Sequence, residues 1–308
     1  MSAKDIITAY KVAVPAKQTQ DLPGLDKNIA PGIEYTAQEY WDNEGKPHLQ
    51  EYVGSGKLKG KYALVTGADS GIGRAAAIMF AREGLKGLTF SHLPQEAEDA
   101  EAAAAAIAKE GCDVNVVALD LQHESECQRL VQSHLNRFGT LNILLNNASK
   151  QIITQKIQEI DLANVRGTFE SNILQMIVIT KFAVPYMKRG SAIINTTSVV
   201  AYAGSPSLVD YSSTKGAIMS FTRSLAKQLA PSGIRVNGVA PGPVITSLQP
   251  ASRSAEEMEG FGVGMPLHGR AAQPAELGPS FVFLASPDSN SMTGACIHVN
   301  NGQHVGGS

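Results

Sequence analysis

Cysteine is scarce in this sequence, and neither sign of charge is in marked excess. Cysteine occurs only at positions 112, 127 and 296 among 308 residues. This spacing fits neither a disulfide framework nor a metal-ligand motif, so we expect reduced thiols and no metal site. The formal net charge is −2, with acids and bases interspersed, which argues against nucleic acid or an anionic membrane as a partner.

The sequence also lacks the features of a membrane or secreted protein. No run of about 18 apolar residues occurs, the length needed to span a bilayer as a helix. The N-terminal segment, which starts with residues 1–5, lacks the apolar run that forms the core of a signal peptide. We therefore expect a cytoplasmic protein without a membrane partner.

The first 56 residues show no sustained hydrophobic period, and their four prolines interrupt any long helix. The aromatic residues Tyr35, Tyr40, Trp41 and Tyr52 argue against a simple disordered tail, which is the alternative. We interpret residues 1–56 as an arm that packs on the domain or on a neighbouring subunit. Residues 57–308 are expected to form the catalytic domain.

From residue 58 onward, short apolar runs alternate with helical patterns. The expected strands are residues 62–66, 88–91, 114–119, 141–145, 191–197, 234–240 and 296–299. The expected helices are residues 71–82, one from Pro94, 124–137, 162–187, one ending near 229, and 274–285. Strands that are almost entirely apolar, each followed by a helix, indicate a parallel sheet covered on both faces. We predict one α/β domain of the Rossmann type, with a doubly wound sheet of seven strands.

A cluster of glycines falls where the first of these strands turns into the first helix. Glycines there permit a tight turn, and the helix N-terminus attracts a pyrophosphate. The spacing is Gly-x-x-x-Gly-x-Gly rather than the commoner Gly-x-Gly-x-x-Gly. In this context the turn predicts dinucleotide binding. The candidate residues are Gly67, Asp69, Ser70, Gly71, Ile72 and Gly73.

The end of the second strand bears on the choice of cofactor. A carboxylate at this point binds a ribose 2′-hydroxyl and repels a 2′-phosphate. The segment here contains Ser91 and His92 and no carboxylate. Both side chains are candidate phosphate donors, so we favour NADP(H) over NAD(H). Arg74 lies one residue past the glycine turn, where it either adds to the preference for NADP(H) or only compensates charge on the surface.

Polar residues follow the third and fourth strands. Asp120 is placed to meet an adenine amino group or, alternatively, to cap a helix, and its neighbour Leu121 is a further candidate cofactor residue. Asn147 and Ala148 belong to a compact turn that either lines the ribose or stabilises the sheet.

Acid–base chemistry is suggested by Ser198, Tyr211 and Lys215. The phenol and the ammonium lie one helical turn apart on the same face. A free Tyr has a pKa of about 10 and a free Lys of about 10.4, so neither alone is a useful acid or base at neutral pH. A nearby cation favours the phenolate and lowers the Tyr211 pKa toward the useful range. Ser198 ends a strand, where its hydroxyl is placed to hold a substrate oxygen.

In chain order these pieces resemble the short-chain dehydrogenase/reductase family over about residues 58–303. Bacterial and fungal carbonyl or aldehyde reductases with an N-terminal arm are the most similar subgroup. The resemblance rests on Thr66, Gly67, Gly71, Ile72, Gly73, Asp120, Asn146, Asn147, Ala148, Asn172, Ser198, Tyr211, Lys215, Pro241 and Gly242.

The resemblance implies a role for each catalytic residue. Tyr211 is the general acid in reduction, and Lys215 lowers its pKa and binds the nicotinamide ribose. Ser198 orients the substrate oxygen, and Asn172 holds a water that links Lys215 to solvent. Residues that the resemblance places around the nicotinamide are Pro241, Gly242, Val244 and Thr246. It also implies a homotetramer, paired through the helices that carry Asn172 and Tyr211.

The substrate side is less defined. Ser149 and Lys150 stand where many relatives have glycine, and residues 243–268 lack a period and are expected to form a lid. We expect an NADP(H)-dependent oxidoreductase acting on a carbonyl or secondary alcohol. The alternatives are a pathway-specific ketoreductase or epimerase and, less favoured, a non-catalytic cofactor-binding protein.

Overall fold

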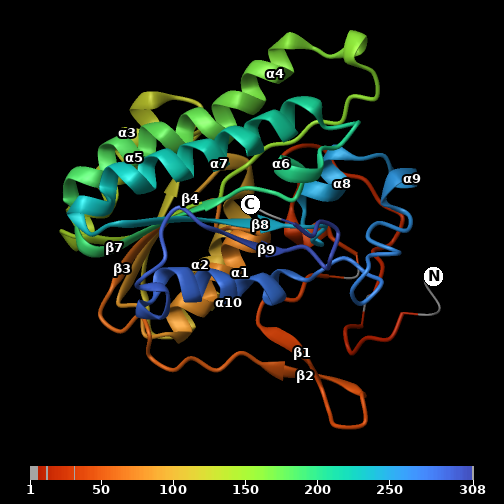
Figure 1. Ribbon diagram of the computed structural model, residues 1–308, viewed down its shortest axis with the longest axis horizontal. Coiled ribbons are helices and arrows are strands. Elements are labelled where there is room, and N and C mark those ends of the chain that lie inside the picture. The colour runs from red at the N-terminus through yellow and green to blue at the C-terminus, as the bar shows by residue number, and fades with distance from the viewer. Residues whose placement is uncertain (1–5, 12, 31, 307–308) are drawn as a thin grey trace.

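A seven-stranded parallel sheet with helices on both faces forms the body of the protein (Figure 1). The computed structural model describes residues 6–11, 13–30 and 32–306. The strands are β3 (Tyr62–Thr66), β4 (Gly87–His92), β5 (Asp113–Ala118), β6 (Leu141–Asn146), β7 (Met187–Thr196), β8 (Arg235–Pro241) and β9 (Cys296–Val299). Their spatial order is β5-β4-β3-β6-β7-β8-β9. The predicted Rossmann-type fold is confirmed.

The helices form two layers (Figure 1). One layer contains α1 (Gly71–Arg82), α2 (Ala97–Lys109) and α10 (Pro274–Ala285), and the other contains α3 (Glu124–Phe138), α5 (Gln175–Ala183) and α7 (Val209–Leu229). Successive side chains of a strand point to opposite faces. Accordingly, Val65 packs in the core under α1 and α10, whereas Leu64 packs in the core under α3, α5 and α7. Burial on both faces explains why β3 is apolar from Ala63 to Val65.

The chain reverses its direction of travel through the sheet at β3. It winds from β3 to β4 and β5 on one side, and then returns to β6 and continues to β9 on the other. The carboxyl ends of β3 and β6 therefore border the crevice in which doubly wound folds bind ligands.

The helix predicted for residues 162–187 is interrupted. It consists of α4 (Leu162–Phe169), a π-helical turn (Glu170–Leu174) and α5, and a short 3₁₀ turn through Pro185 then leads into β7. β7 begins at Met187, earlier than predicted. The prediction missed its first residues because they include the exposed Lys188 and Arg189 and lack an apolar pattern. π-helical turns often mark functional positions, and this one contains Asn172.

The N-terminal arm contains a hairpin that the sequence analysis did not predict. Strands β1 (Ala37–Trp41) and β2 (Pro47–Glu51) pair antiparallel and project from the body (Figure 1). The side chains of β2 are almost all exposed, so no alternation of apolar and polar residues marks it.

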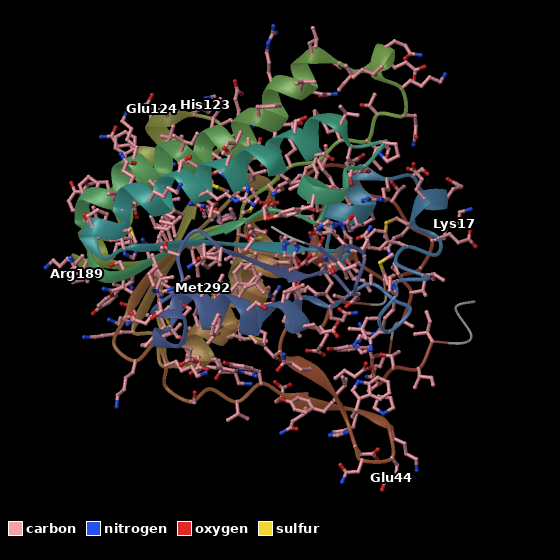
Figure 2. All side chains as sticks on the ribbon, in the orientation of Figure 1. Lys17, Glu44, His123, Glu124, Arg189 and Met292 are labelled. Atoms are coloured by element: carbon pink, nitrogen blue, oxygen red, sulfur yellow. The ribbon has the colours of Figure 1, made fainter. Side chains whose placement is uncertain are left out.

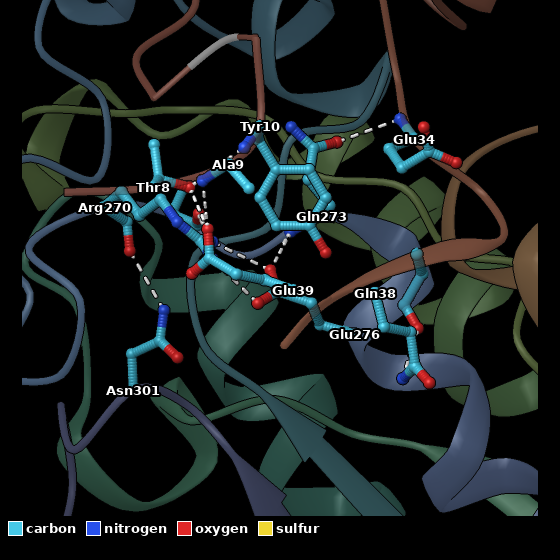
Figure 3. A network of polar contacts seen from close by, with 12 residues as sticks. Thr8, Ala9, Tyr10, Glu34, Gln38, Glu39, Arg270, Gln273, Glu276 and Asn301 are labelled. Carbon is cyan, nitrogen blue, oxygen red and sulfur yellow. Dashed lines mark hydrogen bonds and ion pairs between the residues drawn. The ribbon is translucent and has the colours of Figure 1, made fainter. Parts of the chain in front are cut away.

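A buried ionic network attaches the hairpin to the body (Figure 3). The Arg270 guanidinium is 3.1 Å from the Glu39 carboxylate in β1 and 2.8 Å from the Glu276 carboxylate in α10. It also lies over the Tyr10 ring, 4.7 Å from its centroid. These contacts join three segments that are distant in sequence.

The arm also runs along the short helices α8 (Leu248–Ser252) and α9 (Ala255–Met258). The Pro250 carbonyl accepts hydrogen bonds from the Gln20 amide at 2.9 Å and the Thr19 hydroxyl at 3.2 Å. Lys17 lies at the same end of the molecule (Figure 2), and its ammonium is 3.0 Å from the Glu256 carboxylate. The arm is thus in contact with the segment predicted as a lid.

In the part of the chain that the structure describes, no helix combines the length and apolar character needed to cross a membrane.

Candidate active site

A cleft of about 780 Å³ opens at the carboxyl ends of the strands. Every predicted site residue lines it except Gly73 and Asn172. The predicted residues in its walls are Gly67, Asp69, Ser70, Gly71, Ile72, Ser91, His92, Asp120, Leu121, Asn147, Ala148, Ser198, Tyr211, Lys215, Pro241, Gly242, Val244 and Thr246. The sheet topology therefore brings the glycine turn and the Tyr211 helix to one cavity.

The glycine turn is held by close backbone contacts. A Cβ on Gly73 would lie 2.0 Å from the Gly67 carbonyl oxygen, so only glycine fits there. The Asn147 amide donates to the same carbonyl at 2.9 Å, and the Thr66 hydroxyl accepts from the Asn147 backbone at 2.9 Å. Gly73 and Asn147 thus hold the shape of the turn, and the Asn147 side chain bonds to the Gly67 carbonyl of that turn.

The N-terminus of α1 faces the cleft, as an anion-binding site requires. The buried Asp69 carboxyl has one oxygen without a hydrogen-bond partner, and it lines the cleft beside this helix end. The Gly71 amide donates to the Asp26 carboxyl of the arm at 3.1 Å. Burial raises the Asp26 pKa to about 6. The helix end thus holds a carboxyl of the arm in this structure, which is the kind of group that a helix N-terminus attracts.

The end of β4 differs from the sequence prediction in one respect. Ser91 and His92 line the cleft, but Glu96 does so as well, because its carboxylate folds back to accept from the Leu93 amide at 2.8 Å. A carboxyl therefore does lie near the end of this strand. Burial raises its pKa to about 7. Arg74 is not in the cleft wall, since its guanidinium stacks 4.6 Å from the centroid of the Tyr35 ring.

Asp120 and Leu121 follow β5 and line the cleft. The Asp120 carboxylate accepts from the Gln122 backbone at 3.0 Å and from the Gln122 side chain at 3.2 Å. It thus closes a local turn and does not serve as the N-cap of α3, which is His123.

Ser198, Tyr211 and Lys215 lie in the same wall of the cleft. Ser198 comes two residues after β7, and the other two lie on α7 with 8% and 1% of their surface exposed. The Lys215 ammonium is 5.2 Å from the centroid of the Tyr211 ring and donates to the Thr196 carbonyl at 3.1 Å. β7 and α7 therefore position this set together.

Burial dominates the acid–base properties of this pair. It raises the pKa of Tyr211 to about 12, while hydrogen bonds with the Ser149 and Ser198 hydroxyls and the positive charge of Arg253 oppose the rise. Burial also lowers the pKa of Lys215 to about 7. The expectation that Lys215 lowers the Tyr211 pKa toward neutrality is therefore wrong for this structure, because desolvation outweighs every effect that lowers it.

Asn172 is fully buried behind the cleft, in the π-helical turn. Its side-chain oxygen accepts from the Lys150 amide at 2.7 Å, and its nitrogen donates to the Thr214 hydroxyl at 3.0 Å. Thr214 adjoins Lys215 in the chain. Asn172 thus connects the loop after β6 to α7.

The remaining wall follows β8. A Cβ on Gly242 would lie 2.7 Å from the Asn300 Cα, which restricts this position to glycine. Val244 and Thr246 continue along the cleft to the base of α8.

The walls of the cleft contain further residues that were not in the predicted set. Ser149, whose hydroxyl donates to the Asn172 side chain at 3.2 Å, is one of them, and Arg253 of the segment predicted as a lid and Leu22 and Pro23 of the arm are others. The departure from glycine at position 149 was the signal for Ser149. Nothing in the local sequence marks the others, because long-range contacts bring them to the cleft.

Known proteins are similar to this chain in sequence. The family described as Enoyl-(Acyl carrier protein) reductase matches residues 67–304. The uncharacterized oxidoreductase YhdF of Bacillus subtilis is 45% identical over 289 residues, covering 94% of this chain and 98% of the relative. NADPH-dependent aldehyde reductase 1, chloroplastic, of Arabidopsis thaliana is 44% identical over 276 residues, covering 85% of this chain and 95% of the relative.

A solved structure is similar as well. The short chain dehydrogenase from Burkholderia cenocepacia in complex with NADP has a TM-score of 0.73 and 27% identity, covering 80% of this chain and 98% of that one. Fold and cleft thus define an oxidoreductase with a Rossmann-type sheet. The chain belongs to the short-chain dehydrogenase/reductase family.

Proposed function

We propose that the protein is an NADP(H)-dependent oxidoreductase that interconverts a carbonyl compound and its alcohol. The observation that carries this proposal is the arrangement of Tyr211. Its phenol shares the cleft with Ser149 and Ser198, and the Lys215 ammonium lies 5.2 Å from the centroid of its ring. All of these groups line the cleft that contains the glycine turn.

The residues divide the acid–base work. A bound nicotinamide dinucleotide supplies the hydride for the carbonyl carbon in reduction and accepts it in oxidation. Tyr211 donates its phenolic proton to the carbonyl oxygen in reduction and takes it back in oxidation. Ser198 donates a hydrogen bond to the same oxygen and stabilises the charge that develops there.

Lys215 and Asn172 support the proton supply. The phenolate left on Tyr211 is stabilised by the Lys215 cation, whose pKa of about 7 makes it able to exchange a proton near neutrality. Asn172 holds the adjoining Thr214 through its amide. We propose that it fixes the position of Lys215 and of a proton path to solvent.

NADP(H) is proposed over NAD(H) on two grounds. Ser91 and His92 are polar residues in the cleft at the end of β4, and the relatives named for NADPH or solved with NADP share this fold. The carboxyls of Asp69 and Glu96 act against a 2′-phosphate. The raised pKa of Glu96, about 7, leaves part of its population neutral and weakens that repulsion.

The test is a titration with each reduced dinucleotide, followed by a screen of aldehydes and ketones for consumption of the bound one. We expect tighter binding of NADPH and turnover of at least one carbonyl class. Tight binding of either dinucleotide without turnover across the screen would contradict the enzymatic assignment. Tighter binding of NADH would contradict the cofactor preference alone.

Assembly as a homotetramer in the cytoplasm is also proposed. Leu174, the last residue of the π-helical turn, and Ile177 on α5 are 50% and 40% exposed, and Phe283 on α10 is 36% exposed. Leu174 and Ile177 follow Asn172 in the chain, on one of the two helices through which the family resemblance implies that subunits pair. Light scattering of the purified protein should give four times the chain mass, and cell fractionation tests the location.

A further inference from the structure

The charged residues of the cleft are separated by sign. The carboxyls in its walls belong to Asp69, Glu96 and Asp120, which lie at the glycine turn and after β4 and β5. The cations in its walls are Lys150, Lys215 and Arg253, which lie after β6, on α7 and in the lid. The end of the cleft beside Tyr211 is therefore positive.

Arg253 has no carboxylate partner within the described residues. None of the ion pairs among these residues, defined by a nitrogen–oxygen distance within 4.0 Å, involves the Arg253 guanidinium. Glu257 raises the Arg253 pKa from a greater distance, but burial outweighs it and lowers that pKa. A charge withdrawn from water is normally paired, and the planar fork of a guanidinium matches a carboxylate or a phosphate with two hydrogen bonds.

Neutral contacts hold Arg253 in place. Its guanidinium donates to the Gln249 side chain and lies 5.1 Å from the centroid of the Phe261 ring. The arm fixes its backbone, because the Thr19 hydroxyl donates to the Arg253 carbonyl at 3.0 Å. These contacts orient the side chain and leave its charge uncompensated.

Loop residues opposite the lid extend the polar surface. The Gln151 amide, 3% exposed, donates to the Ser252 hydroxyl at 2.6 Å and to the Gln249 oxygen at 3.3 Å. Gln151, Gln249 and Arg253 all line the cleft. The hydrogen bonds that Gln151 and Arg253 both donate to Gln249 therefore join the loop after β6 to the segment predicted as a lid.

The Arg253 charge lies near the Tyr211 phenol, the group proposed to exchange a proton with the substrate. Arg253 is close enough to Tyr211 for its charge to lower the pKa of the phenol. A substrate whose carbonyl oxygen meets Tyr211 would have its other end near the guanidinium.

We propose that Arg253 binds an anionic group of the substrate, so that the substrate is an aldehyde, ketone or alcohol that also bears a carboxylate or a phosphate. This inference rests on the proposed carbonyl–alcohol chemistry and specifies its substrate class. Lys150 adds positive charge to the same end of the cleft.

Matched substrate pairs test the proposal on the unmodified protein. The pairs are 4-oxobutanoate against its neutral amide, and glyceraldehyde 3-phosphate against glyceraldehyde. We expect kcat/KM for the anionic member of at least one pair to be roughly 10- to 100-fold higher, the usual worth of a hydrogen bond to a charged group. The pair that shows the preference identifies the anion.

Variants assign the preference to the guanidinium. In Arg253→Gln the ratio within that pair should fall toward 1, and in Arg253→Lys, which keeps the charge but loses the planar fork, it should be intermediate. The control is Arg137→Gln, which removes an exposed arginine paired with Asp113 and should leave the ratio unchanged.

The possible failures are distinguishable. Turnover of both members of each pair at equal efficiency would overturn the role of Arg253 and leave the proposed function intact. A preference that survives in Arg253→Gln would also overturn it. No turnover of any carbonyl with either dinucleotide would instead count against the proposed function.

Discussion

Replacing Arg270 with methionine tests whether the N-terminal arm is part of the folded domain. The guanidinium is 1% exposed, and the Glu39 side chain, which it meets at 3.1 Å, is 2% exposed. Methionine has a similar length but leaves the buried Glu39 carboxylate, and the Glu276 carboxylate beside it, without their shared cation. Breaking a buried pair in this way costs about 3–5 kcal/mol, so the free energy of unfolding should fall by that amount.

A double-mutant cycle separates the ion pair from packing. Adding Glu39→Gln to Arg270→Met removes the stranded charge, so we expect it to recover part of the loss. The control is Arg137→Met, because Arg137 and Asp113 are 47% and 54% exposed, and a surface pair contributes about 0–1 kcal/mol.

Urea unfolding followed by circular dichroism measures each free energy, with the slope checked for constancy. The reasoning would be refuted if Arg270→Met cost no more than Arg137→Met. It would also be refuted if Glu39→Gln brought no recovery, because Glu39 would then not depend on Arg270 for its burial.

Two other predictions concern the dinucleotide. The Glu96 carboxyl gains negative charge as pH rises through its pKa of about 7. Fluorescence titrations should therefore show the preference for NADPH over NADH falling between pH 6 and 8 by roughly fivefold, equivalent to about 1 kcal/mol of charge repulsion, and staying level in Glu96→Gln. A fall of equal size in that variant would count against Glu96. Gly73→Ala should abolish dinucleotide binding, because the new Cβ would lie 2.0 Å from the Gly67 carbonyl oxygen, whereas Gly216→Ala on α7 has nothing within 4 Å. Helix propensity favours alanine at position 216 by up to about 1 kcal/mol, so thermal unfolding should show that variant unchanged or more stable. Native dinucleotide affinity in Gly73→Ala would contradict the close approach.

The central strands could be predicted because their surroundings leave a local record. β3 is covered on both faces, so Leu64 and Val65 are both apolar although they point in opposite directions. The glycine turn could also be read, since the approach of Gly73 to Gly67 excludes any side chain. In both cases the constraint falls on residues that are near each other in the sequence.

The parts that escaped prediction depend on distant contacts or on exposed surfaces. β2 has mostly solvent-facing side chains and therefore no periodic signal. The arm reaches the cleft through Leu22 and Pro23, and Arg253 reaches it through the lid. Glu96 was not among the predicted residues because it lies four residues past the end of β4, yet its bond to the Leu93 amide turns it back toward that strand.

Turnover and binding by Tyr211→Phe decide whether this tyrosine supplies the proton. The substitution removes only the hydroxyl, and general acid–base catalysis by one group contributes about 10²- to 10⁴-fold. We expect kcat to fall by that factor while the Kd for the dinucleotide changes little, and Tyr186→Phe, at a 49% exposed tyrosine, to remain unchanged in both. A near-native kcat in Tyr211→Phe would contradict the assignment of Tyr211 as the acid.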